Sequence, residues 1–366
     1  MRQTEVMVIG GGPAGLSAAI EAATSGCEVT LVDSDLALGG QLIKQTHKFF
    51  GSKDERAGTR GFKIAETLME ELEANKDRVT IHSNCTATGF YAEDGVVSCV
   101  HGEDDYFRIK PTRIIMATGA QERLLPFPNN HLPGVYGAGA VQTLMNVYGV
   151  VPGKKVLMVG AGNIGLIVSY QLMQAGVQVV GIVEAMDKIG GYWVHAAKVR
   201  RMGVPIYLRH TVKEALGDKI VTGAVIQEID DKFQPTGAEV NIDVDVICMA
   251  VGLTPTCELL WQAGCQMAFV PQLCGYVAQR DKHMRTSNDD IWVAGDAAGI
   301  EEASSAMVEG RIAGLGVAKS LGKIDSGEYS KRLAEFARRL ADLRGGEVGA
   351  KICQGIACCT VNEWGV

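Results

Sequence analysis

The chain has 366 residues, which corresponds to about two domains at roughly 150 residues per domain. Hydrophobic residues make up 47% and charged residues 21%, values typical of a globular protein with a buried core. Lys and Arg number 35 against 42 Asp and Glu, and the net charge of -7 argues against nucleic acid as a partner.

Membrane-spanning and disulfide-rich secreted proteins are also disfavoured. No uninterrupted apolar run reaches the ~18 residues that cross a bilayer, so we expect no membrane span. Most of the ten cysteines lie in apolar segments, as Cys27, Cys99 and Cys248 do, and this is typical of small buried side chains in a reducing compartment. We therefore expect a cytoplasmic protein.

The N-terminal segment has the pattern of a dinucleotide-binding unit. An apolar strand at residues 6–9 leads into a GxGxxG turn and a helix, and an acidic residue closes the next strand. The turn needs glycine for its tight bend, for approach of a pyrophosphate and for packing of helix on strand, while the helix N-terminus attracts phosphate. The candidate binding residues are Gly10, Gly12, Pro13, Ala14, Gly15, Asp33 and Ser34, with Asp33 placed to accept hydrogen bonds from a ribose.

The chain then enters a glycine-punctuated loop, residues 34–61, which contains Gly40 and Gln41. A helix near 62–75 and several short strands follow. A buried strand at 113–116 ends in Ala117, Thr118 and Gly119. Prolines at 126, 128 and 133 disfavour helix, and they predict that this stretch crosses from one domain to the next.

The glycine turn recurs 150 residues later. The second copy consists of Gly160, Gly162, Asn163, Ile164, Gly165 and the acidic Glu184. A single GxGxxG is weak evidence in a chain with 45 glycines, but two copies after apolar strands indicate two dinucleotide sites. The alternative is that the second copy is a glycine-rich turn without a ligand. A helix near 192–201 and strands from 206 to 249 complete this part.

A return segment carries the third motif. An apolar strand at 291–294 ends in Gly295 and Asp296, just before a long helix at 301–320. Asp296 could also be a helix-capping aspartate. The three motifs in this order resemble the pyridine nucleotide-disulfide oxidoreductase superfamily, whose members are flavoproteins with two dinucleotide-binding domains.

The resemblance implies an α/β protein with two Rossmann-like domains of the glutathione reductase type. The FAD domain would be discontinuous, residues 1–122 and 253–325, around an NAD domain at 123–252, with a C-terminal helix and cysteine-containing tail at 326–366. It further implies that the first glycine turn and Asp296 bind FAD, with Asp296 on the ribityl chain, and that the second turn binds a pyridine nucleotide. Glu184 would repel the additional phosphate of NADP, which favours NAD.

Residues 117–146 are similar to the FAD-binding alpha-type subunits of sarcosine oxidase, opine oxidase, L-proline dehydrogenase and hydrogen cyanide synthase. This likeness implies an FAD- and NAD-binding subunit that passes electrons in an amine or imino-acid dehydrogenase complex. Its partners would be a second flavoprotein and a small iron-sulfur subunit in a hetero-oligomer. The alternatives are a free-standing NADH-dependent reductase of ferredoxin or rubredoxin type, and a structural subunit that only holds the cofactor. Disulfide reductases of the superfamily carry a redox cysteine pair either in the loop after the first unit or inside the second domain. Here that loop has no cysteine and the second domain has no C-x-x-C, so thioredoxin and glutathione reductases are excluded.

The C-terminal segment combines an apolar helix stripe with three cysteines. Tyr329, Leu333, Phe336, Leu340 and Leu343 share one helix face, which packs either on the chain's own domain or on a partner. Cys353, Cys358 and Cys359 are close enough in sequence to bind an iron-sulfur cluster, yet number one fewer than the usual four. A partner cysteine, a non-cysteine ligand or no cluster at all remain open. No catalytic acid or base is assigned, because hydride transfer depends on stacking and exclusion of water.

Overall fold

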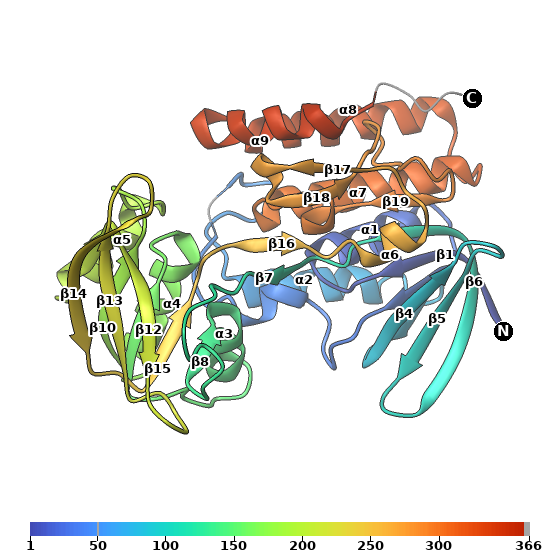
Figure 1. The fold of residues 1–366 in the computed structure, drawn as a ribbon. Coiled ribbons are helices and arrows are strands. Elements are labelled where there is room, and N and C mark those ends of the chain that lie inside the picture. The colour runs from blue at the N-terminus through green and yellow to red at the C-terminus, as the bar shows by residue number, and fades with distance from the viewer. Residues whose placement is uncertain (50, 362–366) are drawn as a thin grey trace. The chain divides into compact units, whose positions relative to one another are not determined.

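The computed structural model describes residues 1–49 and 51–361 (Figure 1). The chain forms two compact units. Unit 1 consists of Met1–Gln121 and Thr254–Val366, and unit 2 of Glu122–Leu253. The chain passes between them through the short strands β7 (Ala120–Glu122) and β16 (Leu253–Pro255).

The prediction that the proline-rich stretch forms the crossing is wrong, because residues 126–133 lie inside unit 2. Phe127 and Leu132 are buried in its core, and the Pro128 carbonyl accepts a hydrogen bond from the Ala215 N–H at 3.0 Å. The prolines keep this segment out of a helix, as expected. Its apolar residues Phe127 and Leu132, however, pack it into the core of unit 2.

Unit 1 is built on a seven-stranded sheet of order β3-β2-β1-β6-β5-β4, with β19 paired to β6. Strands β3, β2, β1, β6 and β19 run parallel, while β4, β5 and β6 are antiparallel. The bounds are β1 Arg2–Ile9, β2 Val29–Val32, β3 Val79–His82, β4 Cys85–Tyr91, β5 Val96–His101, β6 Asp105–Met116 and β19 Ile291–Val293. Residues 6–9 are buried on both faces, as continuous apolar runs in parallel sheets are.

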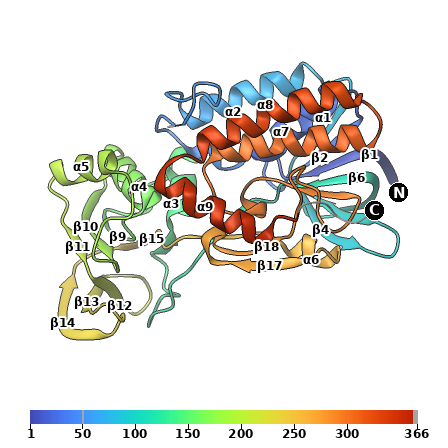
Figure 2. The same ribbon diagram turned by 90° about the horizontal axis from the view of Figure 1, so that it is seen from above.

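The helices of unit 1 cover this sheet. Helix α1 (Pro13–Thr24) packs closely against α7 (Ala303–Ser320), and α7 in turn packs against α8 (Ser326–Leu343), which runs beside it in Figure 2. The remaining elements are α2 Gly61–Glu73, α6 Glu258–Gln262, α9 Gly346–Cys359, the 3₁₀ turns η1 Gly40–Lys44, η2 Pro271–Leu273 and η3 Gly295–Ala298, and the hairpin strands β17 Met267–Val270 and β18 Gly275–Ala278.

Unit 2 is also built on a parallel sheet, with fewer strands than the sheet of unit 1. Its five-stranded parallel sheet has the order β11-β10-β9-β15-β8, and an antiparallel sheet β12-β13-β14 lies in the same unit. The strands are β8 Val135–Gly137, β9 Lys155–Val159, β10 Gln178–Glu184, β11 Ile206–Leu208, β12 His210–Leu216, β13 Gly223–Ile229, β14 Pro235–Ile242 and β15 Val246–Met249; the helices are α3 Ala138–Asn146, α4 Asn163–Gln174 and α5 Trp193–Arg201. The predicted α/β class is confirmed.

The C-terminal helices belong to unit 1. The predicted apolar stripe lies on α8, where Phe336 and Leu340 are buried in the unit 1 core and Tyr329, Leu333 and Leu343 pack against it. Docking onto the chain's own domain, one of the two predicted alternatives, is therefore observed. Among the described residues, no helix is both long and apolar enough to cross a bilayer.

Candidate dinucleotide sites

The glycine turn of unit 1 connects β1 to α1. Gly10 has φ +106°, and a Cβ atom there would overlap the Ala117 carbonyl oxygen; one at Gly15 would overlap the Gly10 oxygen. At Gly12, which caps α1, the nearest atom to such a Cβ is Gly40 Cα at 3.9 Å. The turn is thus closed on its protein side, and at Gly12 there is room for a ligand to approach.

The start of α1 lacks a side-chain cap. Gly12 has no side chain, and Pro13 at the first helical position has no N–H. The first amides of a helix have no intrahelical partner, and together with the helix dipole they favour an anion. Gly12, Pro13, Ala14 and Gly15 therefore fit a pyrophosphate.

Asp33 lies at the carboxyl end of β2, beside this turn. Its carboxylate accepts hydrogen bonds from the Gly11 N–H and, at 2.7 Å, from the Asp35 N–H. Burial raises the pKa of the Asp33 carboxyl, while these two backbone hydrogen bonds act to lower it. The neighbouring Ser34 is exposed. Asp33 is thus oriented by the backbone at the edge where an adenosine ribose would lie.

Gly40 brings the following loop against the same turn. The Gly39 N–H donates to the Gly11 carbonyl at 2.8 Å, and a Cβ at Gly40 would lie only 2.8 Å from Gly12 Cα. Gly40 has φ +52° and Gln41, next in the chain, is exposed. The predicted loop residues therefore do meet the glycine turn.

The end of β6 forms another wall of the site. Ala117, which blocks any side chain at Gly10, donates its N–H to the Ile9 carbonyl at 2.8 Å. The Thr118 hydroxyl donates to the Thr256 carbonyl at 2.6 Å, and Gly119 has φ +71°. These contacts fix the backbone where the strand ends.

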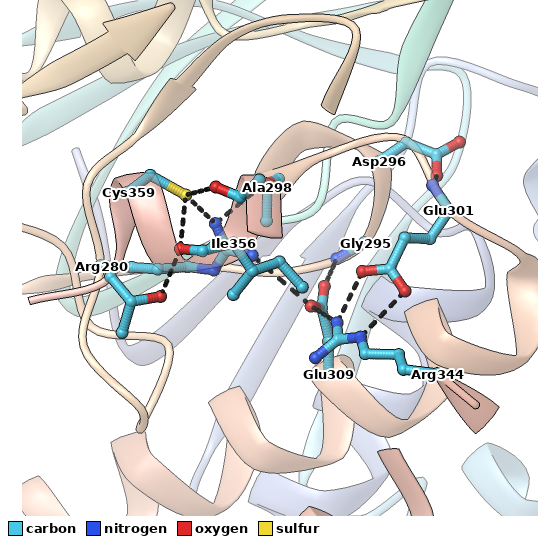
Figure 3. A network of polar contacts seen from close by, with 11 residues as sticks. Arg280, Gly295, Asp296, Ala298, Glu301, Glu309, Arg344, Ile356 and Cys359 are labelled. Carbon is cyan, nitrogen blue, oxygen red and sulfur yellow. Dashed lines mark hydrogen bonds and ion pairs between the residues drawn. The ribbon is translucent and has the colours of Figure 1, made fainter. Parts of the chain in front are cut away.

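Gly295 and Asp296 complete the set at the end of β19. Gly295 has φ +70°, a Cβ there would lie 2.7 Å from the Ala14 Cβ, and its N–H donates to Glu309 Oε2 at 3.0 Å. Asp296 Oδ1 accepts one long hydrogen bond, 3.4 Å, from the Glu301 N–H (Figure 3). Asp296 Oδ2 receives no hydrogen bond from any described residue, so a ligand hydroxyl would satisfy it.

The electrostatics around Asp296 are unusual. Burial raises the pKa of Asp296 to about 7, and the negative charges of Glu309 and Glu301 add to the shift. An under-bonded carboxyl that is partly withdrawn from water fits the ribityl hydroxyls of FAD, which can donate hydrogen bonds to it. The capping alternative accounts for only one of its two oxygens.

Unit 2 reproduces the same local geometry. Gly160 has φ +107°, a Cβ there would overlap the Ala250 oxygen, and a Cβ at Gly165 would overlap the Gly160 oxygen. At Gly162 a Cβ would meet no described atom within 4 Å. Glu184 accepts hydrogen bonds from the Ala161 N–H at 2.8 Å and from the Met186 N–H at 3.0 Å, as Asp33 does in unit 1.

Sequence reasoning missed two parts of the second site. The first part is the loop with Gly190 and Gly191, which packs against the glycine turn. The Gly191 N–H donates to the Ala161 carbonyl at 2.9 Å, and the Tyr192 N–H donates to Asn163 Oδ1 at 2.8 Å. Ala250, at the end of β15, takes the place of Ala117. Both were detectable, because each acid is followed six residues later by a Gly-Gly pair and Met116–Gly119 recurs as Met249–Gly252. Ile164, the remaining predicted residue, is exposed at the start of α4.

The three C-terminal cysteines, which were candidate ligands of an iron-sulfur cluster, do not converge. They lie on one helix, α9, where Cys358 and Cys359 point about 140° and about 120° away from Cys353 at ~100° per residue. Cys353 and Cys358 are exposed, whereas Cys359 is buried and its Sγ accepts from Arg280 Nη1 at 3.4 Å. Among the described residues, no group of three or more His, Cys, Asp or Glu side chains could hold a metal ion.

These features define a class: an α/β protein with two Rossmann-like units, each with a glycine turn that is a candidate dinucleotide site. Residues 4–310 match the family described as pyridine nucleotide-disulphide oxidoreductase. The chain belongs to this family and is an oxidoreductase. Membership implies the use of FAD and a pyridine nucleotide.

Similar proteins include an opine oxidase subunit from Agrobacterium tumefaciens, 28% identical over 85% of this chain and 64% of that protein. The HcnB subunit of hydrogen cyanide synthase from Pseudomonas protegens is 26% identical over 92% of this chain and 75% of its own length. The chain thus spans less than two thirds of the opine oxidase protein. It spans only 33% of the alpha subunit of sarcosine oxidase from Corynebacterium sp., to which it is 26% identical over 87% of this chain.

Two solved structures are similar in fold. L-proline dehydrogenase from P. horikoshii has a TM-score of 0.67 and 26% identity, covering 91% of this chain and 59% of that one. Thioredoxin reductase from T. acidophilum has a TM-score of 0.70 and 23% identity, covering 88% of this chain and 99% of the other. The second likeness concerns the fold alone.

Proposed function

We propose that this chain is an FAD- and NAD-binding oxidoreductase subunit that passes electrons in an amine or imino-acid dehydrogenase complex, with a sarcosine-, proline- or opine-like substrate. The observation that carries the proposal is that the same arrangement occurs twice. In unit 1 the Asp33 carboxylate accepts a hydrogen bond from the Gly11 N–H, and in unit 2 the Glu184 carboxylate accepts one from the Ala161 N–H. The relatives support the complex, because those named above include subunits of opine oxidase and sarcosine oxidase.

FAD would lie in unit 1. The amides at the start of α1 would face its pyrophosphate, Asp33 its adenosine ribose and Asp296 its ribityl chain. When bound, FAD supplies the redox chemistry, because it accepts electrons from one reactant and delivers them to another. The chain's own residues bind it, orient it and shield it from water.

NAD would lie in unit 2 at the start of α4. Gly162 leaves space for the pyrophosphate, and Glu184 would accept hydrogen bonds from a ribose. None of the three residues that follow Glu184, which are Ala185, Met186 and Asp187, is basic. Arg209, whose backbone N–H donates to the Met186 carbonyl, is already paired with Asp231 and, at 3.9 Å, with Asp187. This favours NAD over NADP.

The proposed partners are a second flavoprotein and a small iron-sulfur subunit in a hetero-oligomer. No step is assigned to a cluster on this chain, because the thiols of α9 diverge. The ten cysteines, all of them described residues, form no disulfide, which fits a reducing compartment, and we propose the cytoplasm.

The test is purification of the tagged full chain from its native cell, followed by flavin analysis and quantitative mass spectrometry. We expect about one FAD per chain, a second flavoprotein in equal amount, and flavin bleaching by an N-methyl amino acid, proline or an opine. A lone yellow chain that oxidises NADH would instead indicate a free-standing acceptor reductase. A chain whose FAD is reduced by neither donor would indicate a purely structural role, and a colourless chain that cannot be reconstituted would refute the proposal.

A further inference from the structure

Arg344 follows α8 and lies beyond the residues that match the family, 4–310. Its side chain is 13% exposed, and it makes three short contacts with two acids. Nε donates to Glu301 Oε2 at 3.0 Å, and Nη2 donates to Glu301 Oε1 and to Glu309 Oε1, each at 2.6 Å (Figure 3). Charge-assisted hydrogen bonds of this length are among the strongest polar contacts in proteins.

Both acids also contact the motif at the end of β19. Glu309 uses its second oxygen, Oε2, to accept the Gly295 N–H at 3.0 Å. Glu301 donates its own backbone N–H to Asp296 at 3.4 Å. Arg344 is therefore connected to Gly295 through Glu309 and to Asp296 through Glu301.

The charge balance at this point depends on Arg344. Three acids lie close together, Asp296, Glu301 and Glu309, and they face two arginines, Arg344 and Arg280 (Figure 3). Arg280 reaches Glu309 only at 3.7 Å, and its Nη1 donates instead to the Ala298 carbonyl at 2.8 Å and to Cys359 Sγ. Burial opposes the charge of Arg344, but Glu309 and Glu301 raise its pKa overall.

Loss of Arg344 would leave Glu301 without a cationic partner among the described residues, and Glu309 with one distant partner. A buried charge left without its partner is strongly unfavourable, so the acids would turn away or take up a proton. Turning away would release the Gly295 N–H from Glu309 and shift the Glu301 backbone that donates to Asp296, whereas uptake of a proton would relieve the repulsion and preserve these contacts.

We propose that Arg344 is a positioning residue for the FAD site of unit 1: through Glu309 and Glu301 it holds Gly295 and Asp296 in place. The C-terminal segment is then part of the cofactor site. The inference rests on the proposed function, because the ligand of that site is FAD.

The test compares Arg344→Gln with Arg338→Gln in the full-length apoprotein. Arg338 lies on the adjoining helix α8, is 59% exposed and pairs with Asp342 on the surface, so it is a matched control. The first readout is hydrogen exchange of residues 291–300 without FAD. The second is the dissociation constant of FAD at pH 6 and pH 8.

We expect Arg344→Gln to accelerate exchange at residue 295 at least tenfold and to weaken FAD binding about tenfold at pH 8. The loss should be smaller at pH 6, because protonation of one of the three acids relieves their repulsion. Arg344→Lys should recover part of the affinity, while Arg338→Gln should stay within twofold of the wild type. A role in stability alone would lower the melting temperature without this dependence on pH.

Equal exchange and equal affinity in Arg344→Gln and the wild type would overturn the inference. Should Arg344→Gln fail to fold, Arg344→Lys undergoes the same measurements, and wild-type values in it would likewise overturn the inference. A wild-type chain that does not bind FAD would refute the proposed function instead, and the exchange measurement on the apoprotein would still decide the role of Arg344.

Discussion

The carboxylate of Glu184 accepts a hydrogen bond from the backbone N–H of Ala161 at 2.8 Å, inside the glycine turn of unit 2. Asp33 makes the equivalent bond to Gly11 in unit 1. In both units an acid from the second strand is thereby held beside the turn. In the proposed function, this fixed carboxylate would discriminate between NAD and NADP.

We expect the chain to prefer NADH over NADPH by at least about tenfold, which corresponds to ~1.4 kcal/mol. A phosphate on the ribose would lie against Glu184, and repulsion between the two negative charges disfavours it. The measurement is the rate of flavin reduction by each nucleotide over a range of concentrations. Glu184→Ala should bring the two nucleotides closer together, whereas Glu239→Ala, an exposed acid of the same unit, should not. Equal reduction by both nucleotides in the wild type would contradict this prediction.

Asp296 should make the stability of the apoprotein depend on pH. Burial raises its pKa from 3.8 to about 7, so the folded chain holds a proton that the unfolded chain loses. Its contribution to stability is complete below about pH 4 and is lost as the pH rises to about 7.

Asp296→Asn should therefore be more stable than the wild-type apoprotein at pH 8 by up to about 4 kcal/mol, because the shift spans roughly three pKa units, and the difference should shrink toward pH 5. Calorimetry of the two apoproteins at both pH values measures this difference. The same substitution should weaken FAD binding at least tenfold, while Asp243→Asn, at an exposed ion pair of unit 2, serves as the control. A constant difference across this pH range would show that Asp296 is not the titrating group.

Gly310 should not tolerate alanine. A Cβ at this position of α7 would overlap the Ala14 carbonyl oxygen of α1, and the two helices would have to separate. Overpacking of this kind costs about 1–3 kcal/mol, and the displaced α1 should also bind FAD more weakly. Urea unfolding and FAD titration measure the two effects. Gly345→Ala, where the nearest atom is Asp342 O at 3.4 Å, should change neither.

The cysteines of α9 should differ in reactivity. Iodoacetamide should modify Cys353 and Cys358 in the native protein, because both are exposed. Cys359 should react only after unfolding, since burial raises the pKa of its thiol and keeps it protonated. Mass spectrometry of proteolytic peptides, combined with iron analysis, tests this prediction. Protection of all three thiols in an iron-containing native protein would contradict it.

The sequence by itself determined the two Rossmann-like units and most of the residues that surround their glycine turns. At Gly10 and Gly15 the backbone approaches so closely that a side chain cannot fit, and this requirement is visible in the pattern of glycines. The acids at 33 and 184 were found for a similar reason, because strand length places them at the same edge of each sheet. Such constraints are local, so they appear at fixed spacings along the chain.

Only the tertiary structure decided where the C-terminal segment packs and which residues it contacts. The spacing of Cys353, Cys358 and Cys359 allowed a ligand set, but one helix directs the three thiols apart. The apolar stripe on α8 predicted that this helix packs against another surface, but it did not indicate whether that surface belongs to the same chain or to a partner. Arg344 was not predicted at all, because its partners, Glu301 and Glu309, lie 43 and 35 residues away in sequence. Charge pairs between distant segments leave no periodic signal, and they form only when the packed core brings those segments together.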